Sequence, residues 1–471
     1  MARTCGTNLI LFCIEIRAIK LGIPFALVLS LVWTHNAYAS GPGDLDLSFN
    51  KTGIVTTSVS SNNDFGYAIA LQPDGKLIVA GLSDGGAGGN ATLEADIAVV
   101  RYNIDGSLDA SFNNSGIVTT TLGSGSGGGS QTAVAVQPDG KIVIAASVNN
   151  DTSYTNSDFA VLRYQSNGSL DPNFNGTGIV TTSISSRADV VLAVALQPDG
   201  KIVVAGHSDS SSDTALPDFD FAMARYHRNG SLDTTFNSTG IVTTPIGDDS
   251  DFGVSLAIGS DGKLVMAGAN YGVSPGGECA VVRYNNNGSL DSSFNGSGIV
   301  TTPCNSGGAY DVAIQRDGKI VVSGRGLMLR YNNNGSLDPN FNSTGMISSP
   351  VAGNAVAVQF NSKIVMAGLT SGLDSDFAVA RYLTNGSPDT RFNKTGIVTT
   401  SINAGGGISW GGDVGTAVAL QPDGKIVVAG YSLDNGKAYF TVIRYVGDSP
   451  FTFLSIIFKR PHVEYFNEIK R

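Results

Sequence analysis

Residues 67–80 read YAIALQPDGKLIVA, two apolar runs joined by Pro73-Asp74-Gly75-Lys76. Asp-Gly between two apolar runs is a strong β-hairpin signal, because glycine adopts the positive φ that a tight turn requires. The segment therefore predicts two short antiparallel strands, 67–72 and 77–80. The arrangement returns along the chain with small changes, such as Ser260-Asp261-Gly262 or Asn361-Ser362-Lys363 in the turn.

Two further elements come after each hairpin. Residues 97–102 read IAVVRY, and a Leu108-Asp109-x-x-Phe112 connection leads to GIVTT at 116–120. These runs predict a third and a fourth strand, so that each unit has strands a, b, c and d. The aspartate of the connection recurs after 63, 62, 62, 58, 47 and 51 residues, at Asp46, Asp109, Asp171, Asp233, Asp291, Asp338 and Asp389. This period is too long for a helical solenoid and fits four short strands with loops.

The repeat predicts an all-β fold, a seven-bladed β-propeller of four-stranded antiparallel blades, because propellers usually have about 4 to 8 blades. A content of 60 glycines and only 14% charged residues agrees with many short strands and turns. The chain opens with a d-type strand at 54–57 and ends with a c-type strand at 440–445. We therefore expect the amino-terminal strand to complete the last blade, with Val55 beside Val442, which removes free strand edges.

The ends of the chain stand outside the repeat. Residues 1–39 place Arg17 and Lys20 before an apolar run at 21–33, and end in the small-x-small sequence Ala37-Tyr38-Ala39. They predict a signal peptide, since the apolar run is shorter than the about 20 residues of a membrane span; a retained anchor is the alternative. We expect the propeller at 40–446 and a non-repeat tail at 447–471. The mature chain is expected to be secreted or held in the cell envelope, without membrane insertion.

The charge narrows the class of partner. Residues 1–39 carry Arg3, Arg17 and Lys20 against Glu15, a net of +2, so the mature chain has −10 − 2 = −12. This acidic balance disfavours nucleic acid, whose phosphates repel it. The charge is compatible with binding to cations, basic proteins or neutral glycans. We expect a monomer whose partner is a protein or a glycan.

The repeated motifs resemble the delta-60 repeat of secreted bacterial proteins, and more loosely the NHL and gluconolactonase-like propellers. The likeness covers 45–445 and includes the Leu-Asp-x-x-Phe connection, the Pro-Asp-Gly-Lys turn and the Arg-Tyr pair. It implies a propeller and export, but no reaction, because the delta-60 proteins share none that transfers to these residues.

Loop lengths separate two faces. The a–b turns and c–d connections scarcely vary and share one end of the blades, here named the constant face. The b–c and d–a loops vary and share the opposite end, the variable face, where one b–c loop is only Arg325-Gly326. Functional loops on rigid scaffolds tend to be the varied ones. The candidate binding face comprises Tyr154, Tyr271, Tyr310, Trp410, Asp209 and Asp213; solvated loops without a ligand are the alternative.

The repeated Arg-Tyr is interpreted as structural. The arginine ends strand c on the constant face, on the same side of the strand as buried apolar residues. A buried guanidinium needs a partner, because an unpaired buried charge is costly. The aspartate of the next connection is the expected partner, which predicts the pairs Arg101 with Asp109, Arg163 with Asp171, and Arg444 with Asp46 from the opposite end of the chain.

Two cysteines remain after the predicted signal peptide. Cys279 begins a c strand and Cys304 follows the d strand at 299–302 of the same unit. Antiparallel pairing brings those strand ends together, and export favours oxidation. The sequence therefore predicts a Cys279–Cys304 disulfide bond.

Signals of catalysis are sparse. Outside the predicted signal peptide the histidines are His207, His227 and His462, and the sequence contains no nucleophile elbow, Walker loop or Cys-x-x-Cys. We expect no catalytic residue, metal or cofactor. The favoured function is a binding or interaction scaffold acting through the variable face. The alternative is a carboxylate-dependent hydrolase or lyase with its site at the mouth of the central channel.

Overall fold

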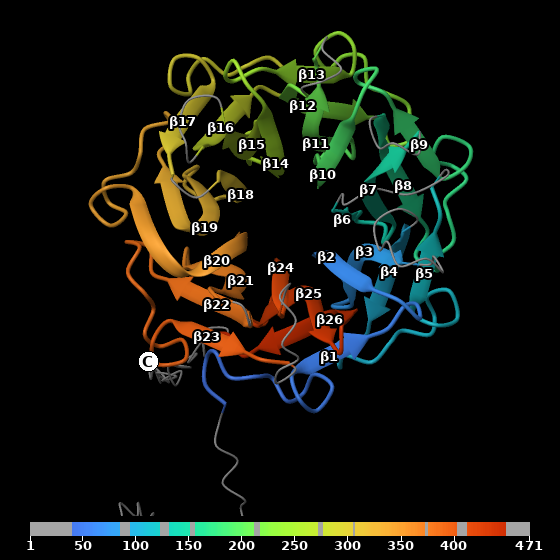
Figure 1. Cartoon of the computed structure of the whole chain (residues 1–471), viewed down its shortest axis with the longest axis vertical. Helices are drawn as coiled ribbons and strands as arrows, with labels where there is room; N and C mark the ends of the chain where they lie inside the picture. Colours follow the sequence, from blue (N-terminus) through green and yellow to red (C-terminus); the bar gives the residue numbers. More distant parts are fainter. Residues whose placement is uncertain are drawn as a thin grey trace, which may run out of the picture. The chain divides into compact units, whose positions relative to one another are not determined.

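The computed structural model describes residues 40–84, 95–122, 131–150, 156–211, 217–271, 277–304, 307–372, 375–402 and 412–448. The chain divides into two units, 1–39 and 40–471, and all of the described residues belong to the second. The regular elements, within the described residues, are β-strands, and the sheets stand around a common axis (Figure 1). The expected all-β propeller architecture is confirmed.

Four sheets of four antiparallel strands succeed one another, each in the order of the chain. Their strands are β2 (Asp64–Leu71), β3 (Leu77–Asp84), β4 (Ala95–Tyr102) and β5 (Ile117–Thr120); β6 (Ala133–Val136), β7 (Ile142–Asn149), β8 (Ser157–Tyr164) and β9 (Ile179–Thr182); β10 (Asp189–Leu196), β11 (Ile202–Asp209), β12 (Phe219–Tyr226) and β13 (Ile241–Thr244); β14 (Asp251–Ile258), β15 (Leu264–Asn270), β16 (Glu278–Tyr284) and β17 (Ile299–Pro303).

The next two units share one sheet, so the structure has six sheets and not seven separate ones. This sheet contains six strands: β18 (Ala309–Ile314), β19 (Ile320–Tyr331), β20 (Met346–Val358), β21 (Ile364–Thr370), β22 (Phe377–Tyr382) and β23 (Ile397–Thr400). The reason is loop length. Arg325-Gly326 is too short to interrupt β19, and β20 pairs with β19 through its first part and with β21 through its second. The expectation of four separate strands is wrong in these two units.

The last sheet joins the two ends of the chain. It has the order β1-β26-β25-β24, with β1 (Ile54–Thr57), β24 (Val414–Leu420), β25 (Ile426–Asp434) and β26 (Lys437–Tyr445). β1 pairs antiparallel with β26, and Val55 lies opposite Val442, the register that the sequence predicts. In Figure 1 the blue β1 lies beside the red β26.

Six of the seven innermost strands contain a bulge. In β14 the pairing steps from Gly253 opposite Gly268 to Ser255 opposite Ala267, which leaves Val254 as the extra residue. Comparable shifts occur in β2, β10, β18, β20 and β24. A bulge bends its strand, and a Cβ on Gly268 would stand 1.9 Å from the carbonyl oxygen of Phe252. The close approach therefore requires glycine there.

The hydrophobic core lies between neighbouring units. Each of seven clusters takes side chains from two successive units, and one of them joins Phe49 and Val55 to Leu77 and Phe440. The tyrosine of each Arg-Tyr is buried in such a cluster. Its hydroxyl bonds to a hydroxyl on the d strand of the preceding unit, as Tyr102 does to Thr57 at 2.7 Å. Burial and hydrogen bonding therefore fix each unit against the one before.

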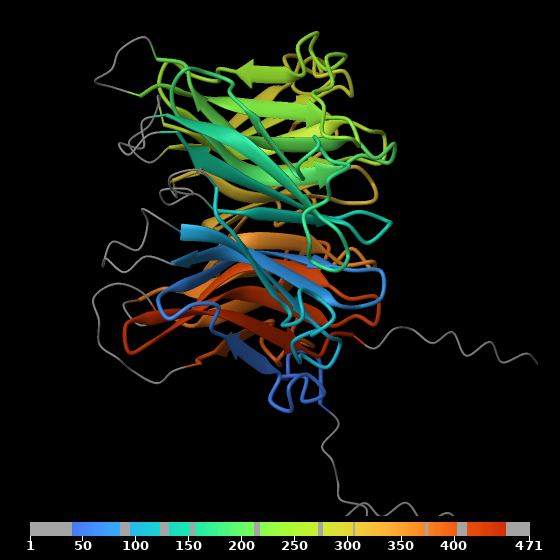
Figure 2. The ribbon, with the colours of Figure 1, turned by 90° about the vertical axis from the view of Figure 1, so that its right-hand side faces the viewer.

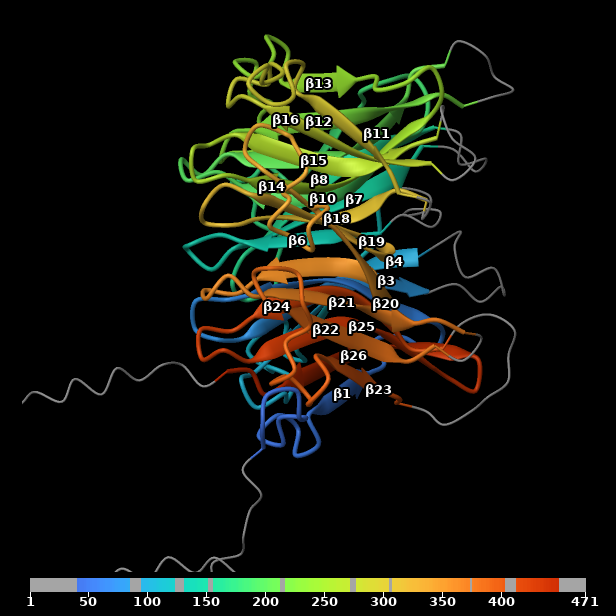
Figure 3. The same cartoon turned by 90° about the vertical axis from the view of Figure 1, so that its left-hand side faces the viewer.

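The turns of the constant face gather at one end of the sheets, as Figure 2 and Figure 3 show from opposite sides. There the c–d connections of neighbouring units are hydrogen bonded, for example Asn113 N to Asn167 O at 2.8 Å. The series includes both chain ends, since Asn50 N donates to Asp105 O and Asn393 N to Pro42 O. The opposite end of the sheets is the variable face.

Candidate functional site

Three of the six candidates for the binding face can be placed. Tyr154, Trp410 and Asp213 lie outside the described residues. Tyr271 follows β15 with 48% of its surface exposed, Tyr310 is a half-buried residue of β18, and Asp209 ends β11 and is buried. Tyr271 and Tyr310 come together, while Asp209 has a different role.

Tyr271 and Tyr310 meet over the segment before β18. The Tyr271 hydroxyl donates to the carbonyl oxygen of Gly307 at 2.7 Å. A Cβ on Gly307 would lie 3.6 Å from the Tyr271 hydroxyl and 3.9 Å from that of Tyr310, so both hydroxyls border this glycine. Burial, followed by the nearby Tyr310 and Cys304, raises the pKa of Tyr271. The Tyr271 phenol is therefore a neutral hydrogen-bonding group at neutral pH.

Four aromatic side chains form what we name the aromatic patch: His207, Phe219, Phe252 and Tyr271. The His207 ring stands 5.0 Å from each of the Phe219 and Phe252 rings, and Phe219 lies 5.2 Å from Phe252. Tyr271 meets Phe252 edge to face at 5.6 Å. Burial lowers the pKa of His207 to about 4. The patch is thus uncharged at neutral pH and extends from the buried His207 to the exposed Tyr271.

A second aromatic group lies at the junction of the first and last units. Phe65 of β2 stands edge to face with Tyr431 of β25 at 5.0 Å, and Tyr67 lies 6.3 Å from Phe65. All three side chains are half-buried. Neither Phe65 nor Tyr67 was among the candidates, although both stand where strand a begins at the variable face.

Asp209 is a structural anchor rather than a contact residue. Its carboxylate pairs with Arg187. It also accepts hydrogen bonds from the backbone N–H groups of Ser211 and Asp218, at 3.0 and 3.1 Å. These bonds hold both ends of the loop after β11, so the Asp209 charge is engaged within the protein, and its contact with a ligand stays a prediction. The buried position leaves no free acceptor surface.

Three other carboxylates lie beside the aromatic patch, and we name them the acidic group: Asp218, Asp220 and Asp251. Burial raises the pKa of Asp220, and the charge of Asp218 raises it further. Burial also raises the pKa of Asp251, as do the charges of Asp220 and Asp218. Asp218 and Asp220 flank Phe219 in sequence, and Asp251 precedes Phe252. None of these three aspartates is among the residues chosen from the sequence for the candidate binding face.

Aspartates at the start of innermost strands hold the d–a loops. The Asp64 carboxylate accepts from the N–H groups of Val59 at 2.8 Å and Ser60 at 3.1 Å. Asp189, Asp251 and Asp413 accept loop N–H groups in the same way. Asp311 on β18 accepts from the Ser255 hydroxyl at 2.6 Å and from Val312 N and Val356 N. Asp64, Asp189, Asp251 and Asp413 thus shape the variable face, and an aspartate at or next to the start of the strand was the sequence signal for these four.

The constant face carries the predicted ion pairs. Arg101 Nε lies 2.7 Å from Asp109 Oδ2, Arg163 Nε 2.8 Å from Asp171 Oδ2, and Arg444 Nε 2.7 Å from Asp46 Oδ2. A lysine of each a–b turn joins every pair, as Lys76 does to Asp109 at 2.8 Å. The sequence analysis missed this lysine, although the repeated Asp-Gly-Lys carried it.

Each guanidinium also binds the neighbouring unit. It lies over the phenylalanine of its own connection, 4.4 to 4.7 Å from the ring centre. Its Nη1 donates to a backbone carbonyl of the next unit, as Arg101 does to Ser166 at 2.5 Å. In the sixth unit Asp448 replaces that carbonyl and accepts from Arg381 at 2.9 Å. The charges of the constant face are thus used in holding units together.

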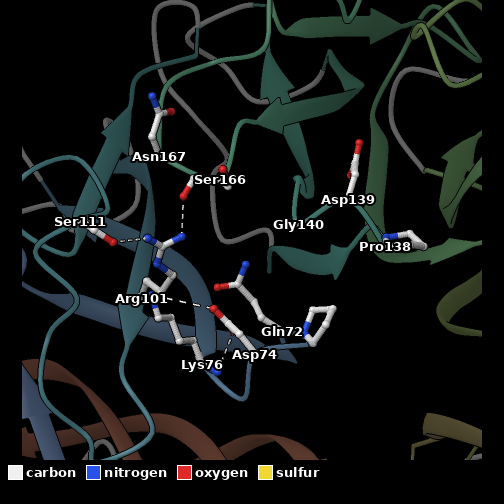
Figure 4. Close-up of a pocket in the computed structure, with 11 residues that line it drawn as sticks. Gln72, Asp74, Lys76, Arg101, Ser111, Pro138, Asp139, Gly140, Ser166 and Asn167 are labelled. Atoms are coloured by element: carbon white, nitrogen blue, oxygen red, sulfur yellow. Dashed lines mark hydrogen bonds and ion pairs between the residues drawn. The ribbon is translucent and has the colours of Figure 1, made fainter.

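A groove of about 490 Å³ lies on this face between the first two units (Figure 4). Gln72, Lys76 and Arg101 line one side, and Asp139 and Ser166 of the next unit line the other. Figure 4 shows Arg101 reaching both Ser111 and Ser166. A similar groove lies between the fourth and fifth units. The groove is therefore a product of the repeat, and its basic groups are already paired.

Cys279 and Cys304 are both buried and are not joined by a disulfide bond in the structure, so the bond between them stays a prediction. Cys279 stands opposite Thr302, and Cys304 lies two residues further along the chain. The thiols still interact, since a hydrogen bond with Cys304, together with burial, raises the pKa of Cys279.

No group of three or more His, Cys, Asp or Glu within the described residues is arranged to hold a metal ion. Across the same part of the chain, no helix has the length and apolar character to cross a membrane.

The fold and repeats define the chain as a β-propeller protein. It belongs to the family described as "Domain of unknown function (DUF5122) beta-propeller", whose profile matches residues 72–112, 137–174, 197–236, 259–294, 315–341, 361–392 and 421–448. Seven matches agree with the seven repeats read from the sequence. No curated protein sequence matches the chain.

Among solved structures the chain is similar to an inactive virginiamycin B lyase from Staphylococcus aureus with quinupristin, at 10% identity and a TM-score of 0.46, covering 83% of this chain and 98% of that one. It is similar to an ulvan lyase, at 10% identity and a TM-score of 0.43, covering 84% of this chain and 96% of that one. It is also similar to a gluconolactonase from Xanthomonas campestris, at 12% identity and a TM-score of 0.32, covering 66% of this chain and 96% of that one. These likenesses carry no conclusion about the activity of this chain.

Proposed function

We propose that the chain is an exported, monomeric, seven-bladed propeller that acts as a binding scaffold for a protein or glycan through its variable face. In this proposal the six-stranded sheet counts as two blades, and the pairing of β1 with β26 closes the ring. The resemblance to delta-60 proteins and the sequence of residues 1–39 support export. The ligand surface is the aromatic patch with Tyr310.

The observation that carries this proposal is the contrast between the two faces. On the constant face the arginine of each Arg-Tyr pairs with an aspartate that a turn lysine also contacts, and it reaches the neighbouring unit, so these charges hold the fold. On the variable face Tyr271 is 48% exposed and continuous with Phe252, Phe219 and His207. Tyrosine offers a large rigid apolar surface and a polar tip, the combination favoured at interfaces.

The alternative is a carboxylate-dependent hydrolase or lyase. That chemistry requires two carboxyl groups facing one open pocket, about 5 to 10 Å apart. The aspartates of the innermost strands, such as Asp64 and Asp311, are engaged by backbone N–H and hydroxyl donors. Their contacts therefore favour the scaffold over the enzyme.

A glycan array probed with the purified protein, followed by titration of the bound glycans, tests the scaffold. Tyr271→Ala should weaken binding at least tenfold. Phe360→Ala is the matched control, because Phe360 is an aromatic residue of the constant face with 80% of its surface exposed, and it should leave binding unchanged. Equal binding by both variants, or no binding at all, would contradict the proposed surface. Shortening of a bound glycan would assign the chain to the alternative.

A further inference from the structure

We propose that the variable face binds an organic cation, an alkylammonium or guanidinium group, between the aromatic patch and the acidic group at the boundary of the third and fourth units. The inference rests on the proposed function and names the chemistry of one ligand group at that surface.

Two strand ends bring acidic and aromatic residues together in register. β12 begins with Phe219 between Asp218 and Asp220, and β14 begins with Asp251 followed by Phe252. The Ser250 hydroxyl connects the two ends, since it donates to Pro217 O at 3.1 Å and accepts from Phe219 N at 3.2 Å. The rings of Phe219 and Phe252 meet at 5.2 Å. The carboxylates and rings therefore border the same boundary.

One buried acceptor at this boundary is open. Asp251 is 0% exposed, and its Oδ2 accepts from Ile246 N at 2.7 Å and Gly247 N at 3.0 Å, whereas Oδ1 has no hydrogen-bond partner. In the equivalent aspartates of other units, Oδ1 accepts from a serine of strand b, Ser83 for Asp64 and Ser208 for Asp189. The residue opposite Asp251 is Asn270. A buried acceptor without a partner destabilises the fold, so a donor supplied by a ligand is favourable here.

The negative charges at this boundary also favour a positively charged ligand. Asp218 and Asp220 raise the pKa of Asp251 through repulsion, after the larger effect of burial. Arg187 pairs with Asp209, which also accepts from Asp218 N, so its charge is already used. His207 is uncharged at neutral pH, because burial lowers its pKa to about 4. A ligand with a positive charge relieves this repulsion, and an anion increases it.

The rings indicate an organic cation rather than a metal ion. Calcium takes about 6 to 8 oxygen ligands at close range, and aromatic faces supply none. Cations on alkyl or guanidinium groups interact favourably with aromatic faces. Their carbon atoms can cover Phe219 and Phe252 while N–H groups reach the carboxylates. The exposed Tyr271 borders the approach from solvent.

Calorimetric titration of the purified protein with spermidine and, separately, with a hexalysine peptide tests the proposal. Saturable binding of either probe supports the proposal. Higher affinity per site for spermidine indicates a free amine as the ligand, and higher affinity for hexalysine indicates a side chain of a protein. Asp220→Asn and Asp218→Asn should each raise Kd about fivefold or more, and Phe219→Leu about threefold. Affinity should fall with added salt, because partly exposed charges are screened.

Asp139→Asn is the charge-matched control, because Asp139 is an exposed aspartate of the constant face whose pairing is with Lys141 at 3.6 Å; it should leave Kd unchanged. Thermal melting of every variant establishes that it is folded. No saturable binding, or an equal loss with Asp139→Asn, overturns the cation site. If amines fail while Tyr271-dependent glycan binding persists, the scaffold stands without the cation site; if both fail, the variable face is not the binding surface.

Discussion

Arg444 Nε donates to Asp46 Oδ2 over 2.7 Å, although 398 residues of chain separate the two. Lys425 lies 3.3 Å from the same carboxylate oxygen, and the guanidinium stands 4.5 Å from the Phe49 ring centre. Its Nη1 donates to Ile104 O of the first unit at 2.6 Å. These are the contacts that Arg163 makes inside one continuous stretch of chain, so the two ends are joined as any internal unit is.

The first prediction concerns this pair. Removing one partner of a buried ion pair leaves a charge without compensation and costs about 3–5 kcal/mol. Asp46→Asn and Arg444→Met should each lower the thermal midpoint by several degrees, and the double variant should lose less than the sum of the two. Thermal melts of the four proteins give the coupling. Asp423→Asn, an exposed site, is the control, and strictly additive losses would show that the two side chains do not interact.

Acid should weaken the constant face. In the folded protein burial opposes ionisation of Asp109, but Lys76, Ser111 and Arg101 outweigh it, and its pKa falls below the ordinary range. The equivalent aspartates behave alike. An aspartate with a lowered folded pKa contributes stability that is present above the unfolded value of about 3.9 and is lost as pH falls below it. Melting temperature against pH should therefore drop steeply below pH about 4; a flat profile to pH about 3 would refute this account.

His207 should make the free energy of unfolding depend on pH in a second, less acidic range. Burial lowers its pKa to about 4 in the folded protein, against about 6.5 when unfolded. The unfolded chain therefore takes up a proton first, and stability falls as pH drops from about 6.5 to about 4. In His207→Phe, unfolding across this range should take up about one proton fewer, so the dependence of the unfolding free energy on pH should be weaker. Unfolding measured across that range for both proteins tests the assignment, and an unchanged slope would show that His207 does not titrate as described.

The bulge of β14 makes Gly268 sensitive. An alanine there places Cβ 1.9 Å from Phe252 O, and relieving such overpacking typically costs about 1–3 kcal/mol. Gly268→Ala should therefore lower the melting temperature markedly. Ala146 is the matched control, because β6 pairs from Ala133 opposite Ala145 without a bulge. Ala146→Gly should cost only the about 0.5–1 kcal/mol of a strand glycine, and equal losses at the two sites would argue against the bulge.

The parts of the fold that are local in the repeat could be predicted from sequence. The Asp74-Gly75 turn, the Arg-Asp pairs and the register of Val55 against Val442 are determined by one unit and the phase of the two ends. The six-stranded sheet β18–β23 could not be predicted, because whether Arg325-Gly326 interrupts a strand depends on backbone pairing with β20. The sequence also did not predict that Asp251 Oδ1 lacks a hydrogen-bond donor, because this depends on which residue of the neighbouring strand stands opposite Asp251.

The candidate site was predictable only in part. Tyr271 was chosen from loop variability, and the structure joins it to Phe252 and His207. The internal contacts of Asp209 could not be predicted, because no sequence pattern displays the backbone N–H groups that its carboxylate accepts from. The sequence brought Cys279 and Cys304 to the same strand ends, and the structure places their thiols in contact through a hydrogen bond.

The pairing of β1 with β26 is tested most directly by cross-linking. Val55 and Val442 are opposite in the antiparallel register, where Cα atoms lie about 4.5–5.5 Å apart, within disulfide range. The double variant Val55→Cys, Val442→Cys should form this bond on oxidation, and mass spectrometry of the digested protein should recover the two peptides linked. Val118→Cys with Val442→Cys, the same position in the neighbouring unit, should not link. Unlinked peptides from the first variant, or equal linkage in both, would contradict a propeller whose two chain ends share one blade.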